Sequence, residues 1–426
     1  MRIGIQTWGS YGDVRPFLAL SAGLAAAGHE VTLYVTSIDE SDYSAESGEL
    51  GVNIKMVGTI EMGSREDLLE VGRKIVSDRN TLRQMKTIMT EFFEPYEDEM
   101  FRAAMELCEN NDIIIGHALH HPLQAAASIK GKPYGTVALF HGLVPTSMRP
   151  PILLPNLGRG GNIFFWALIR FAINRVLRRY INDFRKKHDL PPVKDCFDEV
   201  WVSKKMNLIG VSSVFCEHHG DWGRNHRVCG FFDTPRLMKE GEISPDLQGF
   251  IDAGEKPLFM GFGSMMILAA HAQREVVDIF MEAAREAGCR AIIQASLWHE
   301  CGMNHDEQFY FVEHCSHALV FPQCLAVVHH GGSGTTQATT KAGVPSIIVI
   351  HLADQEGWAY ETKRIGIAPK PVRRSKLTAK NLAERIKTVM ASHDMQARAK
   401  AVGESVRKED GVANAVAFIE SMNLTR

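Results

Sequence analysis

An apolar segment that runs directly into a glycine-rich turn constrains this chain more than any other feature. Residues 325–328 have the composition of a buried strand, and the run His329-His330-Gly331-Gly332-Ser333-Gly334-Thr335-Thr336 follows at once. A helix is expected to begin near Thr335. Because the first amides of a helix lack intrahelical partners and carry the positive end of its dipole, this junction predicts a diphosphate cradle. The alternative is a turn that only joins a strand to a helix.

Side chains in the same turn donate hydrogen bonds to oxyanions. The hydroxyls of Ser333, Thr335 and Thr336 are donors, and His330, neutral or protonated, donates through a ring nitrogen. Such donors stabilise the charge that builds on a leaving phosphate. The predicted contacts here are His330, Gly332, Ser333, Gly334 and Thr335.

A second apolar segment ends in glycines at residues 257–265, and Ser264 is its predicted phosphate contact. In an open parallel sheet, ligands bind beyond the carboxyl ends of the strands, so two such ends can face one diphosphate. Taken alone, these glycines are equally compatible with tight packing.

Strands and helices alternate in both halves of the chain, which predicts parallel, doubly wound sheets. The first half is expected to contain helices near 17–27 and 85–108. A segment rich in glycine and proline separates the halves. The predicted domains are 1–227, a linker at 228–257, and 258–400. The expected strands are 3–6, 31–35, 113–115, 133–138 and 208–211, then 258–261, 290–294, 309–312, 326–328 and 346–349.

The loop after the first strand, Gly9-Ser10-Tyr11-Gly12-Asp13, lacks the third glycine of a dinucleotide-binding fingerprint. This argues against a nicotinamide-dependent enzyme. A carboxylate at such a strand end can take the proton of a hydroxyl that attacks a sugar, so Asp13 is the predicted general base. Alternatively, Asp13 caps a helix that begins near Pro16.

Motifs along nearly the whole chain resemble those of the family of antibiotic, sterol and plant glycosyltransferases with the GT-B fold, and the antibiotic and sterol branch most of all. They comprise Gly9 to Pro16, Ala27-Gly28-His29-Glu30-Val31, Asp221-Trp222, Gly261 to Met265, His329 to Thr336, Ala342-Gly343-Val344-Pro345, Asp354-Gln355 with Trp358, and Glu409-Asp410-Gly411-Val412. The resemblance implies two Rossmann-like domains facing each other across a cleft. It also implies that a helix within 401–426 returns to the first domain.

The same resemblance implies roles for individual residues. The antibiotic and sterol branch carries its proposed base at Asp13, whereas plant relatives use a histidine that is absent here. Further implied donor contacts are Ser10, Gly12, Ser316, His317, Asp354 and Gln355, and implied acceptor contacts are His117, His141, Phe165 and Trp358. From local sequence, Asp354 and Gln355 equally suit a helix N-cap followed by a surface glutamine. Single histidines such as His117, His120, His121 and His141 are more often packing or surface residues than catalysts, and their clustering favours His117 or His141 as a helper of the base.

Two departures from the plant pattern leave the choice between UDP and dTDP open. No tryptophan stands at the base-stacking position, and Ala338 replaces a ribose-binding glutamate. No Asp-x-Asp triplet is present to hold a metal on the diphosphate, so no metal and no other cofactor is expected. The implied reaction is a metal-independent, inverting transfer of a hexose, most simply glucose from UDP-glucose. The implied acceptor is a hydrophobic alcohol such as a sterol, terpenoid, polyketide, phenolic or lipid.

Composition limits partners and location. The net charge of −3 gives no sign of nucleic-acid binding, and eight scattered cysteines fit a reducing compartment. With no signal peptide evident, a cytoplasmic protein is expected. The apolar stretch 163–177 contains arginines and is too short to span a bilayer. It is expected either to bury most of its surface in the first domain, with its arginines exposed, or to lie on a membrane surface.

Two other functions remain compatible with the sequence. A sugar-nucleotide epimerase of GT-B architecture would bind the same donor without needing an apolar acceptor groove. A non-catalytic protein would keep the diphosphate cradle but would have no use for a base. The joint presence of Asp13, His330, Asp354 and Gln355 favours the transferase over the non-catalytic protein.

Overall fold

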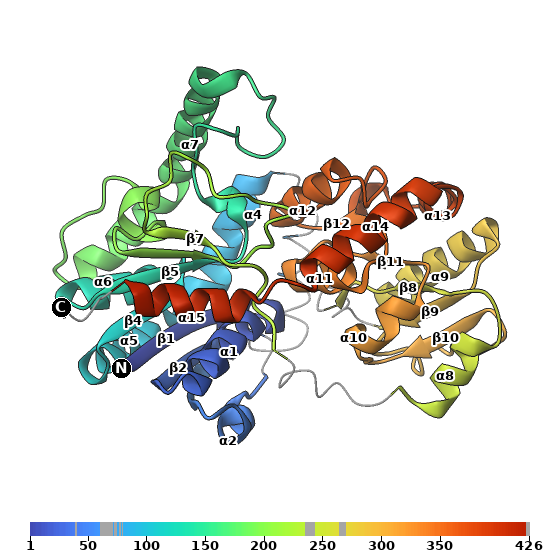
Figure 1. Ribbon diagram of the computed structural model, residues 1–426, viewed down its shortest axis with the longest axis horizontal. Helices are drawn as coiled ribbons and strands as arrows, with labels where there is room; N and C mark the ends of the chain where they lie inside the picture. The colour runs from blue at the N-terminus through green and yellow to red at the C-terminus, as the bar shows by residue number, and fades with distance from the viewer. Residues whose placement is uncertain are drawn as a thin grey trace. The chain divides into compact units, whose positions relative to one another are not determined.

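A computed structural model of the protein describes residues 1–38, 41–59, 71, 75, 78, 80–234, 243–263 and 270–422. Ser264 therefore lies outside the described residues, and Asp354 is described through its backbone alone. The chain divides into two compact units (Figure 1). Unit 1 is formed by Met1–Glu61, Asn80–Leu237 and Glu409–Arg426, and unit 2 is formed mainly by Met238–Lys408.

Unit 1 contains a seven-stranded parallel sheet in the order β3-β2-β1-β4-β5-β6-β7. All five strands predicted in this half are present. Two edge strands, β3 and β7, were not predicted. The strands are β1 (Arg2–Gly9), β2 (Glu30–Ser37), β3 (Asn53–Thr59), β4 (Ile113–His117), β5 (Tyr134–Ala138), β6 (Met206–Ile209) and β7 (His226–Val228). Strands β4 to β6 are buried almost throughout, which explains their apolar composition.

Two helices of unit 1 differ from the prediction. Helix α1 (Tyr11–Ala26) begins six residues before the predicted start because Ser10 forms its N-cap and Pro16 is accommodated inside it. The continuous helix expected over 85–108 is interrupted near Pro95, which has no amide hydrogen to donate. The structure has α4 (Thr81–Ile88), a π-helical turn at Met89–Phe93, a 3₁₀ turn at Glu94–Tyr96 and α5 (Glu97–Asn110). The unit also contains α2 (Ser47–Leu50) and α6 (His121–Ile129).

The longest helix is α7 (Gly158–Lys187), which projects from unit 1 (Figure 1). Trp166, Leu177, Ile181 and Phe184 are buried on its inner side. The expectation that this helix buries most of its surface is wrong, because large apolar side chains near its start are about half exposed or more. No helix among the described residues combines the length and apolarity needed to cross a bilayer.

Unit 2 contains a six-stranded sheet in the order β10-β9-β8-β11-β12-β13. Its five predicted strands are present, and the two-residue edge strand β13 was not predicted. The strands are β8 (Leu258–Met260), β9 (Ala291–Gln294), β10 (Phe309–Val312), β11 (Ala326–His329), β12 (Ser346–Ile350) and β13 (Val372–Arg373). The helices are α8 (Pro245–Asp252), α9 (Ala270–Ala287), α10 (His317–Val320), α11 (Ser333–Ala342), α12 (Ala353–Arg364), α13 (Ala379–Ala391) and α14 (His393–Val406).

The last helix, α15 (Gly411–Ser421), belongs to unit 1, whereas the preceding α14 belongs to unit 2. Helix α15 packs against α1 so closely that a Cβ atom added at Gly23 would lie 2.1 Å from Val412 Cγ1. Gly411 meets the backbone of the segment after β7, where an added Cβ would lie 2.3 Å from the carbonyl oxygen of Phe231. Small residues therefore allow the chain to return to the first unit.

This contact makes Gly411→Ala a destabilising substitution. The new methyl group meets backbone atoms that cannot rotate away, so we expect the free energy of unfolding of unit 1 to fall by about 1–3 kcal/mol. The matched control is Gly160→Ala in α7, where an added Cβ meets nothing within 4 Å. That change should be neutral or slightly stabilising. Urea denaturation followed by circular dichroism tests this, and equal effects from the two variants would contradict the proposed packing.

Candidate functional site

Three neighbouring strands of unit 2 end at the same edge of its sheet. Strand β11 pairs in parallel with β8 on one side and with β12 on the other, so their carboxyl ends lie together. The segment after β8 contains Gly263, the one after β11 contains His330 to Gly332, and the one after β12 leads into α12. The two glycine-rich strand ends were expected to face one ligand. They follow β8 and β11, which are adjacent in the sheet.

Glycines bring the backbone close to His330. A Cβ added at Gly332 would lie 2.3 Å from His330 Nε2, and one added at Gly263 would lie 3.4 Å from His330 Cε1. Gly263 and Gly331 also have positive φ angles of 56° and 90°, a region that side chains disfavour. The imidazole therefore lies between two turns, at glycine positions that have no side chains.

His330 is buried, with 9% of its surface exposed. Burial lowers its pKa to about 4, so the ring is neutral at pH 7 and has one N–H donor and one acceptor nitrogen. Nδ1 has no hydrogen-bond partner among the described residues. A buried polar atom without a partner costs free energy that a bound ligand can recover. Of the two protonation states considered from sequence, the structure favours the neutral one.

Helix α11 starts next to this histidine, with Gly332 as its N-cap and Ser333 as its first residue. This start is two residues earlier than expected. Ser333 Oγ accepts a hydrogen bond from Gln337 Nε2 at 3.1 Å, and Thr336 Oγ1 donates to the carbonyl oxygen of Gly332 at 2.8 Å. The Thr336 hydroxyl, predicted to be a phosphate donor, is thus buried and engaged inside the helix. Gly334 is exposed and Thr335 half-buried.

The third strand end contributes Gln355 from the first turn of α12. Its side chain is 2% exposed, and Oε1 accepts hydrogen bonds from the amides of His351 at 2.7 Å and Leu352 at 3.0 Å. The alternative of a surface glutamine is therefore wrong. A Cβ added at Gly331 would lie 3.3 Å from Gln355 Cβ, which places Gln355 beside the turn. The N-cap is Leu352, so Asp354 stands within the helix.

Sequence analysis did not identify His351, which directly follows β12. It is buried, donates a hydrogen bond from Nδ1 to the carbonyl oxygen of Val349 at 2.8 Å, and packs its ring against Phe262. Its pKa is lowered to about 3 by burial, with a smaller contribution from His330. Its position at a strand end, equivalent to that of His330 after β11, is the sequence signal that could have identified it.

The remaining predicted residues of unit 2 lie in or near this region. Ser316 forms the N-cap of α10, where its side chain accepts from the amide of Leu319. His317 stacks on Phe321 and contributes electrostatically to the low pKa of His329. Trp358 is 1% exposed in α12, so the structure places this predicted acceptor contact in the interior of unit 2.

In unit 1, Asp13 lies at the carboxyl end of β1, in the first turn of α1. Its Oδ2 accepts hydrogen bonds from the Ser10 amide at 3.1 Å and the Ser10 hydroxyl at 3.2 Å. A Cβ added at Gly9 would lie 2.5 Å from the same oxygen. The carboxylate is thus oriented by the helix start, as the capping alternative expected, although the helix begins at Tyr11. Gly12 is exposed.

The four histidines of unit 1 that were singled out from the sequence are buried. His117 ends β4, where Nδ1 accepts from the amide of Leu119 at 3.2 Å, and burial lowers its pKa to about 4. His120 and His121 pack against Phe93, and burial lowers both of their pKa values to about 3. His141 lies after β5 with its ring beside Phe140. The predicted acceptor contact Phe165 is half-buried in α7.

The cysteines are free thiols, and all except the half-buried Cys315 are buried. Among the described residues, no group of three or more histidine, cysteine, aspartate or glutamate side chains is arranged to hold a metal ion.

Comparison with known proteins gives a consistent assignment. Residues 309–417 match the family of erythromycin biosynthesis protein CIII-like C-terminal domains. The chain is 29% identical to O-mycaminosyltylonolide 6-deoxyallosyltransferase of Streptomyces fradiae, over 100% of this chain and 98% of that protein. It is 27% identical to a sterol 3-beta-glucosyltransferase of Arabidopsis thaliana, over 98% of this chain and 67% of that protein.

Solved structures agree on the fold. The glycotransferase of kitacinnamycin superposes with a TM-score of 0.71 at 17% identity, covering 99% of this chain and 98% of the other. The glycosyltransferase VinC, solved in complex with DTDP, superposes with a TM-score of 0.64 at 16% identity, covering 99% of each chain. The two Rossmann-like units therefore form a GT-B fold. The match over residues 309–417 to the EryCIII-like C-terminal domain, and the glycosyltransferases that the chain resembles along its length, support an enzyme of this class.

The low pKa of His330 predicts a loss of stability in acid. The unfolded chain takes up this proton near pH 6.5, whereas the folded protein resists it until about pH 4. Stability is therefore complete above about pH 6.5 and falls as the pH drops toward 4, by on the order of 2–3 kcal/mol from this residue.

Urea unfolding of unit 2 measured across this range tests the prediction. His330→Asn should reduce the slope of stability against pH, while the control His393→Asn, at an exposed position of α14, should leave it unchanged. The assignment of a neutral, buried His330 is contradicted by an unchanged slope in His330→Asn.

Proposed function

We propose that this enzyme transfers a hexose, in the first instance glucose from UDP-glucose, to a hydroxyl group of a hydrophobic small molecule. The observation that carries the proposal is the neutral, buried His330 beside the start of α11, where three strand ends meet. First-turn helix amides and a neutral imidazole N–H suit a diphosphate, whose charge increases as the sugar leaves. Because these hydrogen-bond donors can stabilise the diphosphate, the proposed reaction requires no metal.

The donor site would use groups that follow β11 and β12. The amides of Ser333, Gly334 and Thr335 at the start of α11 would hold phosphate oxygens, together with His330. Asp354 and Gln355 would bind the vicinal hydroxyls of the sugar. Because Gln355 Oε1 already accepts two backbone amides, its NH₂ group is the part expected to reach the sugar.

In the proposed reaction, the acceptor oxygen attacks the anomeric carbon while the bond from that carbon to the diphosphate oxygen breaks. Asp13 takes the proton of the attacking hydroxyl, and the nucleoside diphosphate leaves with the bonding electrons. Hydrogen bonds from Ser10 to Asp13 Oδ2 orient the carboxylate. A single displacement of this kind inverts the anomeric configuration, from an α-linked donor to a β-glycoside.

Donor and acceptor are proposed as classes. The Streptomyces fradiae relative is named as a 6-deoxyallosyltransferase and the plant relative as a sterol glucosyltransferase. Both names describe sugar transfer, one of them to a sterol. The donor panel should therefore include UDP-glucose and dTDP-linked 6-deoxyhexoses, and the acceptor panel sterols, macrolides, terpenoids and phenols.

Replacement of the base tests the chemical step. Asp13→Asn should lower kcat by at least about 100-fold, because general base catalysis is lost while the shape is kept. Asp42→Asn is the matched control, since Asp42 is exposed in unit 1 and also accepts from a backbone amide, that of Ser44. Hexose transfer is measured by mass spectrometry without added metal, and the anomer of the product by NMR.

Three results would contradict this account. Equal activity of Asp13→Asn and Asp42→Asn would remove Asp13 as the base, and a product with retained configuration would exclude single displacement. Formation of an epimeric sugar nucleotide without any acceptor would identify an epimerase instead.

Donor binding is tested separately with Gly332→Ala. The added methyl group would collide with His330 Nε2, so the affinity for UDP or dTDP should fall by about tenfold or more. The control Gly249→Ala lies in α8, where an added Cβ meets nothing within 4 Å. Isothermal titration gives both affinities. Unchanged binding in Gly332→Ala would mean that the nucleotide does not occupy this turn.

A further inference from the structure

An unusual concentration of exposed apolar side chains marks α7 and the segment before it. Of the twelve large hydrophobic residues that are exposed among the described residues, seven fall between residues 148 and 171. They are Met148, Leu153, Leu157, Ile163, Phe164, Leu168 and Phe171. Soluble proteins rarely expose apolar side chains in such a group unless the surface binds a partner or a membrane.

The apolar side chains in the helix form a stripe along one face. Phe164, Leu168 and Phe171 are spaced by four and three residues, which places them above one another, and they are 60%, 49% and 69% exposed. Arg175 continues the stripe one turn later. The same face therefore changes from apolar to cationic along the helix.

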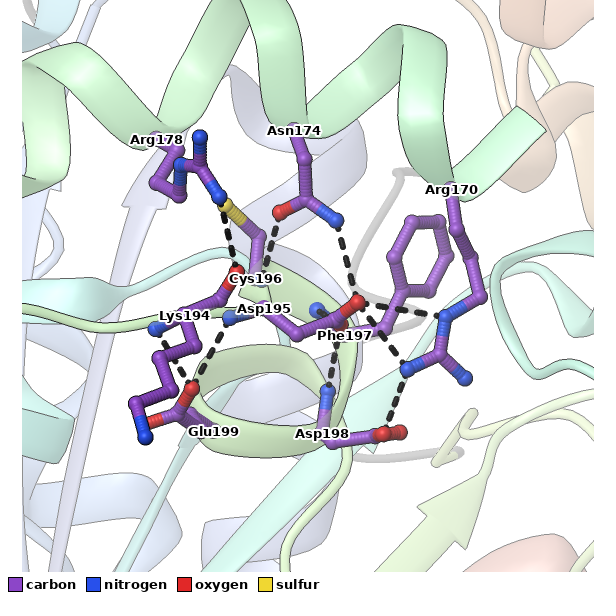
Figure 2. Close-up of polar contacts among 9 residues, drawn as sticks. All are labelled: Arg170, Asn174, Arg178, Lys194, Asp195, Cys196, Phe197, Asp198 and Glu199. Carbon is purple, nitrogen blue, oxygen red and sulfur yellow. Dashed lines mark hydrogen bonds and ion pairs between the residues drawn. The ribbon is translucent and has the colours of Figure 1, made fainter. Parts of the chain in front are cut away.

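Another face of α7 is fixed to the body of unit 1 by polar contacts (Figure 2). Arg170 pairs with Asp195 and Asp198, and Asn174 Nδ2 donates to Asp195 Oδ2 at 3.0 Å. The amide of Cys196 in turn donates to Asn174 Oδ1 at 2.8 Å. These contacts set the rotation of the helix about its axis. The expectation that its arginines lie at an exposed end thus fails for Arg170, which is a structural anchor.

The charge of α7 is opposite in sign to that of the whole protein. The helix has eight basic residues and one acidic residue, a net charge of +7, in a chain whose net charge is −3. A hollow of about 380 Å³ lies along it, lined by Phe171, Asn174, Arg175, Arg178, Arg179 and Asn182. Guanidinium groups beside an exposed phenylalanine suit a phosphate head group whose acyl chains contact the apolar stripe.

We infer that α7 is a docking surface for an anionic lipid bilayer. The helix lies in the interface, with Phe164, Leu168 and Phe171 among the acyl chains and Arg175 with its neighbours on lipid phosphates. The positive charge of α7 matches an anionic surface and disfavours a symmetric contact between two copies of the helix, which would repel each other. This inference does not depend on the transfer reaction.

Binding of the full-length protein to sedimented vesicles tests the inference. Association should be strong with phosphatidylcholine vesicles that contain phosphatidylglycerol, weak with phosphatidylcholine alone, and reduced by salt. The double variant Phe164→Ser/Phe171→Ser should lose about tenfold or more in partitioning, since both side chains are exposed and contribute apolar area only when inserted. Ile129→Ser, at a 44% exposed position of unit 1, is the matched control.

The electrostatic part is tested by Arg175→Gln, which should lower binding to anionic vesicles by about fivefold. Arg224→Gln, at an exposed position in unit 1, should not lower it. Circular dichroism shows whether each variant is folded. An independent readout is Leu168→Cys in a Cys315→Ser background, where an environment-sensitive fluorophore on the new cysteine should shift to the blue with anionic vesicles.

The inference is overturned if the wild-type protein does not bind anionic vesicles, or if Phe164→Ser/Phe171→Ser binds as well as Ile129→Ser. A fluorophore at position 168 that stays in water while the protein binds would also overturn it. If the wild-type protein instead forms a dimer that Phe164→Ser/Phe171→Ser abolishes, without vesicle binding, the surface contacts a second copy of the chain.

Discussion

The adjacency of β8, β11 and β12 is the constraint on which the proposed donor site depends. Parallel pairing brings three carboxyl ends to one edge, and glycines at positions 263, 331 and 332 keep that edge clear of side chains. His330 is thereby buried and neutral, next to the first turn of α11. Gln355 holds the third turn in place by accepting two backbone amides. We propose that these backbone groups and the neutral imidazole form a site for an anion.

Unit 1 combines a rigid interior with an exposed apolar helix. Its sheet and α1 are covered by α15, which returns late in the sequence and packs closely because Gly23 and Gly411 have no side chains. On α7, polar anchors such as Arg170 fix one face while another remains uncovered. The same unit also presents Asp13 at the end of β1. The proposed chemical role and the proposed lipid-binding role therefore belong to separate elements of one unit.

Local sequence was sufficient to predict the strands that are buried on both faces, because a short continuous apolar run is typical of such strands. It was insufficient for edge strands such as β3 and β7, and for the start of α1, where Pro16 suggested a boundary that Ser10 overrides. The burial of Gln355 and the unpaired Nδ1 of His330 depend on contacts between distant strand ends, which periodicity does not report. The exposed face of α7 was also undetermined, since an apolar stripe does not reveal what covers it.

A crystal structure of the protein with UDP, and with dTDP if UDP does not bind, tests the central claim most directly. The account predicts that the diphosphate contacts the first-turn amides of α11 and lies within hydrogen-bonding distance of His330. It would be contradicted if the nucleotide occupied another part of unit 2 while the turn at residues 329–336 remained as it is without ligand.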